Sequence, residues 1–338
     1  MVGKGNFESW FKFALAKKAE IIHIAMYGFK DLDLDFLRLP STNNGFQCLK
    51  DLSLHGLKLT DRDFELLVSN CLALESLTVE SSYELKNVSI VGLSKLMRLN
   101  LSYFVEVESI VIRDAISLVS LTLYQLSSEC TVQLSNTPKL TKLNFQERFG
   151  QVMLAEFLDG MPSCIRGQLQ VMHLATSIDF YMQKMDLNTP DELLLVDLIN
   201  IKHLELEINM RGTCPCWYML SYFRHLVEAC SFSDKLVIKY PYMLRAYNKT
   251  LLEAYVVPDY DKTLLEAYVG VGRCKLSVKY LEITGYLGAP LQLALALYVV
   301  NNARSLESVT VVAADKNALA RAYEDFRHIR SVSFSTYY

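Results

Sequence analysis

The stretch Leu74–Val79 (LESLTV) is the first of four evenly spaced segments that share one apolar frame, L-x-x-L-x-L. The others are Leu96–Leu101 (LMRLNL), Leu118–Leu123 (LVSLTL) and Leu140–Phe145 (LTKLNF). Their starts at 74, 96, 118 and 140 are 22 residues apart three times in succession. A fixed period of about 20–50 residues is the signature of a repeat architecture, in which each unit buries its apolar residues against its neighbours.

The frame continues on both sides of these segments. Leu49–Leu54 (LKDLSL) precedes them, and more diverged copies are Ala19–Ile24, Leu169–Leu174, Ile201–Leu206, Val278–Ile283, Leu306–Val311 and Ile329–Phe334. A second short apolar run lies halfway through each regular repeat, at Leu85–Ile90, Val107–Ile112 and Thr131–Leu134. These runs lack helical spacing, so each repeat reads as a strand and a second extended segment.

Elsewhere the returning segment has helical spacing. Asp61–Leu74 carries apolar residues three and four apart, and Thr60 is a suitable N-cap. We therefore predict an α/β fold, a leucine-rich-repeat solenoid. It is expected to form a curved horseshoe with a parallel concave sheet, and with helices and short strands on the convex side.

The frame divides the chain into three predicted segments. Residues 1–212 form a repeat array with an N-terminal cap, which includes a helix at Glu8–Lys18. Residues 213–277 hold a helix at Cys216–Phe232 and an insertion in which KTLLEAYV occurs twice, at Lys249–Val256 and Lys262–Val269. Residues 278–338 form further repeats and a cap with a helix at Asn317–His328.

Side-chain alternation predicts which residues face the hollow of the horseshoe. In each strand the fourth and sixth frame positions point inward, so the third, fifth and seventh point outward. The fifteen outward residues of the regular block can all form hydrogen bonds: Asp51, Ser53, His55, Ser76, Thr78, Glu80, Arg98, Asn100, Ser102, Ser120, Thr122, Tyr124, Lys142, Asn144 and Gln146. This face is either a partner-binding surface or merely solvated. The predicted partner-binding residues are His55, Glu80, Arg98, Tyr124, Lys142 and Gln146.

Composition narrows the functional classes. The chain has 338 residues and a formal net charge of −3, which disfavours binding to nucleic acid or to an anionic membrane. The N-terminus lacks the apolar core of a signal peptide, and the apolar run Ala289–Val300 is too short to span a bilayer. We expect a soluble intracellular protein, located in the cytoplasm, the nucleus or both.

No pattern typical of catalysis or of a cofactor is apparent. Gly270–Lys275 begins like a dinucleotide loop but lacks the third glycine, and Cys214 and Cys216 are too close for a zinc knuckle. A cation site at Asp31, Asp33 and Asp35, or a zinc or pH-sensing site at His23, His55, His173 and His203, remains an alternative to plain polar surface. We expect no enzyme, no cofactor and no metal, and reduced, buried thiols.

Several segments together resemble the plant F-box/leucine-rich-repeat family of the FBD type. They are Phe7–Lys18, Cys48–Leu54, Leu67–Leu77, Val278–Gly288 and Asn301–Val311. The resemblance covers roughly residues 7–180 and 275–335. It implies a protein-interaction module, in which the repeats of an F-box-type ubiquitin-ligase adaptor select a target protein.

In that family an N-terminal F-box docks a Skp-type adaptor within a cullin ubiquitin ligase. No F-box segment precedes Trp10 in this sequence, so Skp-type adaptor and cullin are expected as partners only of a longer form. The alternative is a stand-alone repeat scaffold, or a decoy without a ubiquitin-ligase link. An inositol polyphosphate, which some such receptors hold, would require clustered Arg and Lys, whereas only Arg98 and Lys142 are predicted on the face.

Overall fold

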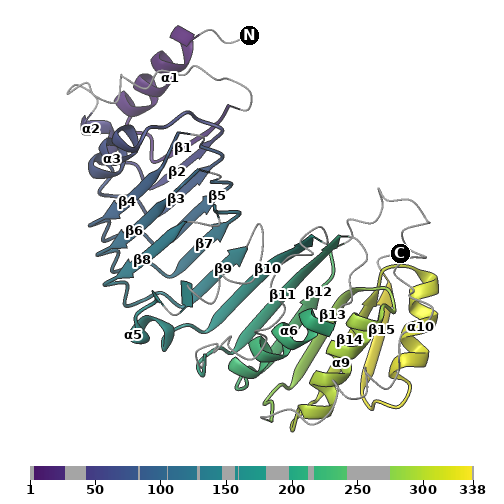
Figure 1. Cartoon of the computed structure of the whole chain (residues 1–338). Coiled ribbons are helices and arrows are strands. Elements are labelled where there is room, and N and C mark those ends of the chain that lie inside the picture. Colours follow the sequence, from purple (N-terminus) through teal and green to yellow (C-terminus); the bar gives the residue numbers. More distant parts are fainter. Residues whose placement is uncertain are drawn as a thin grey trace. The chain divides into compact units, whose positions relative to one another are not determined.

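The structure is a computed structural model of the chain (Figure 1). It describes residues 4–26, 43–82, 84–104, 106–127, 130–146, 157–158, 160–179, 198–211, 217–241 and 275–336. The chain forms two compact units: unit 1 is 1–148 with 159–169, and unit 2 is 149–158 with 170–338. This division falls inside the predicted array of 1–212, and the three predicted segments stay a prediction.

Unit 1 contributes six parallel strands, which we call the long sheet. In spatial order they are β1 (Ile21–Ala25), β2 (Asp51–His55), β3 (Ser76–Glu80), β5 (Arg98–Ser102), β7 (Ser120–Tyr124) and β9 (Lys142–Gln146). Arg98 pairs with Ser76 on one side and Ser120 on the other, and Ser120 pairs with Lys142. The residues 76, 98, 120 and 142 therefore form one row, as the 22-residue period predicts.

The second extended segment of each repeat forms a second parallel sheet in unit 1, the short sheet (Figure 1). Its strands are β4 (Asn87–Val91), β6 (Ser109–Arg113) and β8 (Thr131–Ser135), in this order. Their register again shifts by 22 residues, because Asn87 pairs with Ser109 and Ser109 with Thr131. The two sheets confirm that each regular repeat is one coil of two strands.

Leucines of the frame fill the space inside the coils. Leu74, Leu96, Leu118 and Leu140, which open the frame, are all 0% exposed. The inward residues of the strands, such as Leu99 and Leu121, are also buried. Each fully buried leucine side chain contributes about 1.5–3 kcal/mol. One coil leaves these side chains half-covered, so stacking of neighbouring coils completes the core.

Each coil turns at a residue with a left-handed backbone. Gly56, Ser81, Tyr103 and Gln125 directly follow long-sheet strands and have φ angles of 69°, 56°, 60° and 50°. The backbone N–H of Tyr103 donates to the carbonyl oxygen of Tyr124 in the next coil at 2.8 Å, and that of Gln125 to Gln146 at 3.0 Å. Hydrogen bonds between neighbouring coils thus hold the same left-handed turn in each coil. Of these four residues, only Gly56 avoids the steric cost of a positive φ.

Helices close the first coils of unit 1. Helix α1 (Lys4–Ala16) buries Phe11 and Leu15, and the Phe11 ring lies 6.1 Å from that of Phe46 in α2 (Asn43–Phe46). This confirms a helix at the position of the predicted N-terminal cap. A short helix, α5 (Ser163–Arg166), belongs to the last part of the unit.

Helix α3 (Asp61–Asn70) takes the place of a short-sheet strand in its coil. Its N-cap is Thr60, as predicted, since the Thr60 side chain accepts a hydrogen bond from the Asp63 N–H at 3.2 Å. The helix ends at Asn70 rather than at the predicted Leu74. Its apolar residues Phe64, Leu67 and Val68 are buried.

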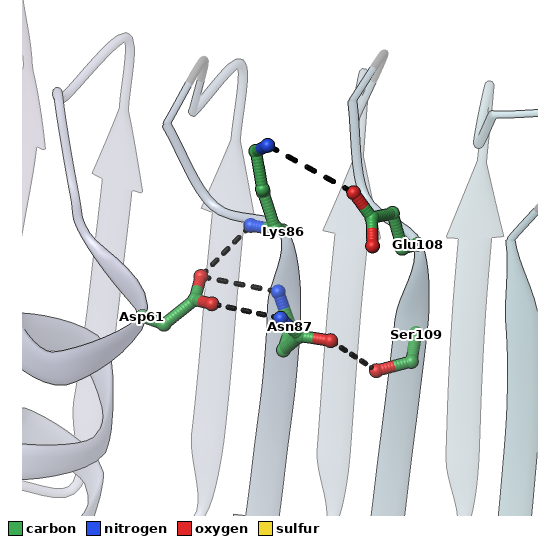
Figure 2. A network of polar contacts seen from close by, with 5 residues as sticks. All are labelled: Asp61, Lys86, Asn87, Glu108 and Ser109. Carbon is green, nitrogen blue, oxygen red and sulfur yellow. Dashed lines mark hydrogen bonds and ion pairs between the residues drawn. The ribbon is translucent and has the colours of Figure 1, made fainter.

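Asp61, at the start of α3, caps the edge of the short sheet (Figure 2). Its Oδ1 accepts hydrogen bonds from the backbone N–H groups of Lys86 (2.8 Å) and Asn87 (3.1 Å), and its Oδ2 accepts one from the Asn87 side chain (3.0 Å). One coil later the N–H groups of Glu108 and Ser109 donate instead to the carbonyl oxygen of Lys86. The Asp61 carboxylate therefore stands where the carbonyl of a preceding strand would be.

Unit 2 repeats the strand–helix pattern with longer returning segments. Its strands pair in parallel in chain order: β10 (Val171–Asp179), β11 (His203–Arg211), β12 (Lys235–Lys239), β13 (Tyr280–Tyr286), β14 (Ser308–Ala313) and β15 (Val332–Thr336). Its helices are α6 (Trp217–Ala229), α9 (Pro290–Asn302) and α10 (Lys316–Phe326). Helices α6 and α10 confirm the predicted Cys216–Phe232 and Asn317–His328.

Unit 2 also holds elements that the sequence frame missed. Strand β12 lies between β11 and β13, within the interval in which no copy of the frame was recognised. Ser233 occupies the position of the first leucine; it is 2% exposed, and its hydroxyl donates to the Ile201 carbonyl at 3.1 Å. Helix α9 was not predicted either. The last strand has the register of the predicted frame Ile329–Phe334, since Val309 pairs with Val332 and Val311 with Phe334.

Several sequence predictions fall outside the described residues. These are the repeated KTLLEAYV at 249–256 and 262–269, the aspartates 31, 33 and 35, the cysteines 214 and 216, and residues 270–274 of the glycine-containing segment. Nothing in the structure bears on them.

Candidate protein-binding face

The outward residues of the long sheet form three rows, which together we call the polar face. The first row runs through Asp51, Ser76, Arg98, Ser120 and Lys142; the second through Ser53, Thr78, Asn100, Thr122 and Asn144; the third through His55, Glu80, Ser102, Tyr124 and Gln146. Neighbouring strands of a sheet are about 4.8 Å apart, and the outer rows of a five-residue strand about 13 Å apart. The backbone thus places polar residues on a regular grid, of which Ser53, Ser76, Ser102 and Gln146 are buried.

Five of the six predicted binding residues have side chains at least partly accessible on this face. Arg98 and Lys142 are exposed in the first row, whereas His55, Glu80 and Tyr124 are half-buried in the third. The two groups therefore lie at opposite ends of the strands: cations at the N-terminal ends, and an aromatic ring, an imidazole and a carboxylate at the C-terminal ends.

His55 and Glu80 come from neighbouring strands and bind each other. His55 Nδ1 and Glu80 Oε2 are 2.6 Å apart, and both side chains are about a quarter exposed. The contact links strands β2 and β3 at the C-terminal end of the face.

Tyr124 is one half of an aromatic pair. Its ring lies 5.1 Å from that of Tyr103, the left-handed turn residue of the preceding coil, and Tyr103 is 38% exposed. Paired aromatic rings at such distances attract one another and offer a rigid apolar contact for a partner. Sequence reasoning missed Tyr103 because the frame ends one residue earlier, although its place directly after a strand was a usable signal.

Gln146 does not present its side chain on the surface. It is 5% exposed, and its Oε1 has no hydrogen-bond partner. The alternation places Gln146 on the outward row correctly, but the residue lies in the last strand of the long sheet, where the regular repeat ends. We therefore leave Gln146 out of the proposed contact residues.

Three of the five described thiols are core residues, whereas the expectation of a buried thiol is wrong for Cys164. Burial raises the pKa of Cys71, Cys130 and Cys230 to about 12, so these thiols stay protonated at neutral pH. Cys164 is exposed and Cys48 half-buried, and both are free. Within the described ranges, no group of three His, Cys, Asp or Glu side chains is arranged to hold a metal ion.

Three of the four outward-predicted histidines contact or adjoin acidic residues of a neighbouring strand. His23 Nε2 lies 3.3 Å from Asp51 Oδ1, and in unit 2 His173 Nε2 lies 3.4 Å from Glu205 Oε1. Glu205 is also paired with Lys239 at 2.6 Å. Burial, followed by the charge of Lys235, lowers the pKa of His203. His23 and His55 lie on neighbouring strands of unit 1, and His173 and His203 on neighbouring strands of unit 2.

None of the helices in the described parts of the chain has both the length and the apolar character needed to cross a membrane.

The regular repeats match a known protein-family model. Residues 16–154 match the model of the leucine-rich repeats of the FBD-associated F-box protein At5g56370. The match contains all six long-sheet strands and the whole short sheet. No curated protein matches the chain. Repeats of this kind are typically interaction modules rather than enzymes. The two parallel sheets and their 22-residue register show a leucine-rich-repeat fold, and residues 16–154 are similar to the repeats of the FBD-associated F-box type.

Proposed function

We propose that the chain is the target-recognition module of an F-box-type ubiquitin-ligase adaptor and that its target protein binds to the polar face. The observation that supports this most is the grid itself. Every outward position of β2, β3, β5, β7 and β9 carries a hydrogen-bonding side chain, while every inward position is apolar and buried. A sheet covered on both sides would be apolar on both.

The contact residues that we propose are His55, Glu80, Arg98, Tyr124 and Lys142, with Tyr103 added from its ring contact. Arg and Tyr side chains are frequent hot spots of protein interfaces. The Tyr103–Tyr124 pair supplies an apolar contact for the target. The charged residues of the face fix the orientation in which the target binds.

Affinity capture with a Tyr124→Ala variant tests the binding face. We expect captured target to fall at least tenfold, about 1.4 kcal/mol, because the aromatic anchor is lost. Arg98→Ala together with Tyr124→Ala should weaken capture further, with a nearly unchanged melting temperature. The matched control is Val91→Ser, which removes an apolar side chain that is 47% exposed on the short sheet. Equal capture by Tyr124→Ala and wild type would contradict the proposed face.

The link to a ubiquitin ligase needs its own experiment. Recovery of a Skp-type adaptor and a cullin with the longest transcript product of the gene would support an adaptor. Recovery of the target alone, without either ligase component, would favour the second candidate, a stand-alone repeat scaffold or decoy that competes for the same target.

A further inference from the structure

The turns that lead into the long-sheet strands are equivalent from coil to coil. In successive coils the N–H of Leu96 donates to the Leu93 carbonyl, that of Leu118 to Ala115, and that of Leu140 to Thr137, at 3.0–3.2 Å. The third residue of each turn therefore occupies an equivalent position in its coil. These residues are Lys95, Ser117 and Lys139. Three residues further along each coil lies its residue in the first row of the polar face.

These two equivalent positions carry an alternating charge pattern. The coil of β5 has Lys95 and Arg98, the coil of β7 has Ser117 and Ser120, and the coil of β9 has Lys139 and Lys142. All four basic residues are exposed, and the two serines between them are half-buried. We call these six residues the basic edge cluster.

The spacing of the cluster follows from the register. Arg98 pairs with Ser120, and Ser120 with Lys142, so the two basic pairs are two strand spacings apart, about 10 Å. This is close to the Debye length at physiological salt, so four like charges repel one another and create a local positive potential. The chain as a whole has a net charge of −3, so a positive potential at this edge is a local one.

Among the described residues, carboxylates near the cluster are not ion-paired with it, although Asp114, whose partner is a neutral amide, keeps its negative charge. Throughout the described part of unit 1, none of the four basic side chains forms an ion pair. Glu80 and Glu84 lie at the opposite ends of the long strands and are paired with His55 and Lys58 at 2.6 Å each. Asp114 lies on the same side as the cluster, where its carboxylate accepts a hydrogen bond from Asn136 at 2.7 Å.

We propose that the basic edge cluster binds an acidic segment of the partner protein, with carboxylates placed about 10 Å apart over the two basic pairs. The Ser117 and Ser120 hydroxyls between the pairs can donate hydrogen bonds to the same carboxylates or to the peptide carbonyls. This inference rests on the proposed function, because it describes which part of the target meets the N-terminal end of the polar face.

The direct test uses an octaglutamate peptide, with octaglutamine as the neutral match, and measures binding by fluorescence anisotropy. The test variant carries Lys95→Ser, Arg98→Ser, Lys139→Ser and Lys142→Ser, which copies the serines already present in the coil of β7. We expect octaglutamate alone to bind wild type, and the variant to lose at least about tenfold in affinity. Binding to wild type should weaken as salt is added.

A charge-matched control separates the cluster from the net charge. Lys275→Ser, Lys316→Ser, Arg327→Ser and Arg330→Ser together remove the same number of exposed cations from unit 2. The control should change affinity less than about twofold. An equal loss in both variants, or no binding of octaglutamate to wild type, would overturn the proposal. So would a single-stranded oligonucleotide that binds through the same four residues more tightly than octaglutamate, because the ligand class would then be wrong.

Capture of the target distinguishes this inference from the function on which it rests. If Tyr124→Ala abolishes capture and the quadruple serine variant does not, the target binds at the C-terminal ends of the strands, and both the acidic segment and the contacts of Arg98 and Lys142 are wrong. If neither variant reduces capture, both proposals are wrong. Loss in both variants, with the unit 2 control unchanged, supports both.

Discussion

Neighbouring residues of one long-sheet strand have opposite roles, because successive side chains point to opposite faces. Leu121 is 0% exposed inside its coil, whereas Ser120 is half-exposed on the polar face. We expect Leu121→Ala to lower the free energy of unfolding by about 2–5 kcal/mol through the cavity that it leaves. Ser120→Ala should change it by about 0.5 kcal/mol or less. Urea denaturation of both variants checks this, and equal losses would show that the inward register is wrong.

The left-handed turn residues carry a local cost that glycine would remove. Gln125 has a φ of 50°, which costs an ordinary residue about 1–2 kcal/mol relative to glycine, partly offset by the greater freedom of glycine in the unfolded chain. We expect Gln125→Gly to stabilise the protein by about 0.5–1 kcal/mol in thermal unfolding. Gln133→Gly is the matched control, since Gln133 lies within strand β8 and the same change should destabilise by about 0.5–1 kcal/mol. A loss of stability in both variants would contradict the turn geometry.

At the scale of whole elements, the junction between helix α3 and strand β4 depends on one carboxylate. Asp61→Ala removes the acceptor of two backbone N–H groups and of the Asn87 amide, and we expect a loss of about 1–3 kcal/mol in unfolding free energy. Glu65→Ala, on an exposed position of the same helix, should have little effect. An Asp61→Ala variant as stable as the Glu65→Ala variant would mean that water replaces the cap at no cost.

The same carboxylate makes this junction sensitive to acid. Partial burial of Asp61 by itself would raise its pKa, but the hydrogen bonds from Asn87 and Lys86 outweigh burial and lower the pKa below its ordinary value. A carboxyl group with a lowered folded pKa stabilises fully above its unfolded pKa of about 3.9 and loses that contribution as the pH falls through the lowered value. The stability difference between wild type and Asp61→Ala should therefore be constant near neutral pH and shrink below about pH 4. A difference that stays constant down to pH 2 would contradict this origin.

Elements with a clear apolar period were predictable, and those without one were not. Helix α6 has one apolar side, whereas α9 also carries apolar residues on its less buried side, at Leu293, Leu297 and Val300, and so has no amphipathic period. Strand β12 was hidden because a hydrogen-bonded serine, Ser233, stands where the frame requires a leucine. A buried hydroxyl that donates to a backbone carbonyl can occupy a core position in place of a leucine. A search for an apolar residue at that position does not find it.

At the scale of the whole molecule, the 22-residue spacing was sufficient to predict the rows of the long and short sheets and five accessible residues of the proposed binding face. What escaped prediction lies off the strands or beyond the regular repeat. Tyr103, Lys95 and Lys139 are turn residues, and the frame assigns no direction to turn side chains. Gln146 is buried in the last strand of the long sheet, where no equivalent coil follows in the sequence. The Asp61 cap joins residues 25 positions apart, and no local pattern reveals it.

The unbroken register of unit 1 bears on how such a chain can change its length. Residues 98, 120 and 142 occupy equivalent pairing positions, because each strand presents buried apolar residues inward and is preceded by an equivalent turn. An in-frame excision that joined residue 98 directly to residue 121 would leave a complete coil with compatible neighbours on both sides. The number of coils, and with it the width of the surface offered to a partner, can therefore vary between related genes in whole steps without any redesign of the residues that remain.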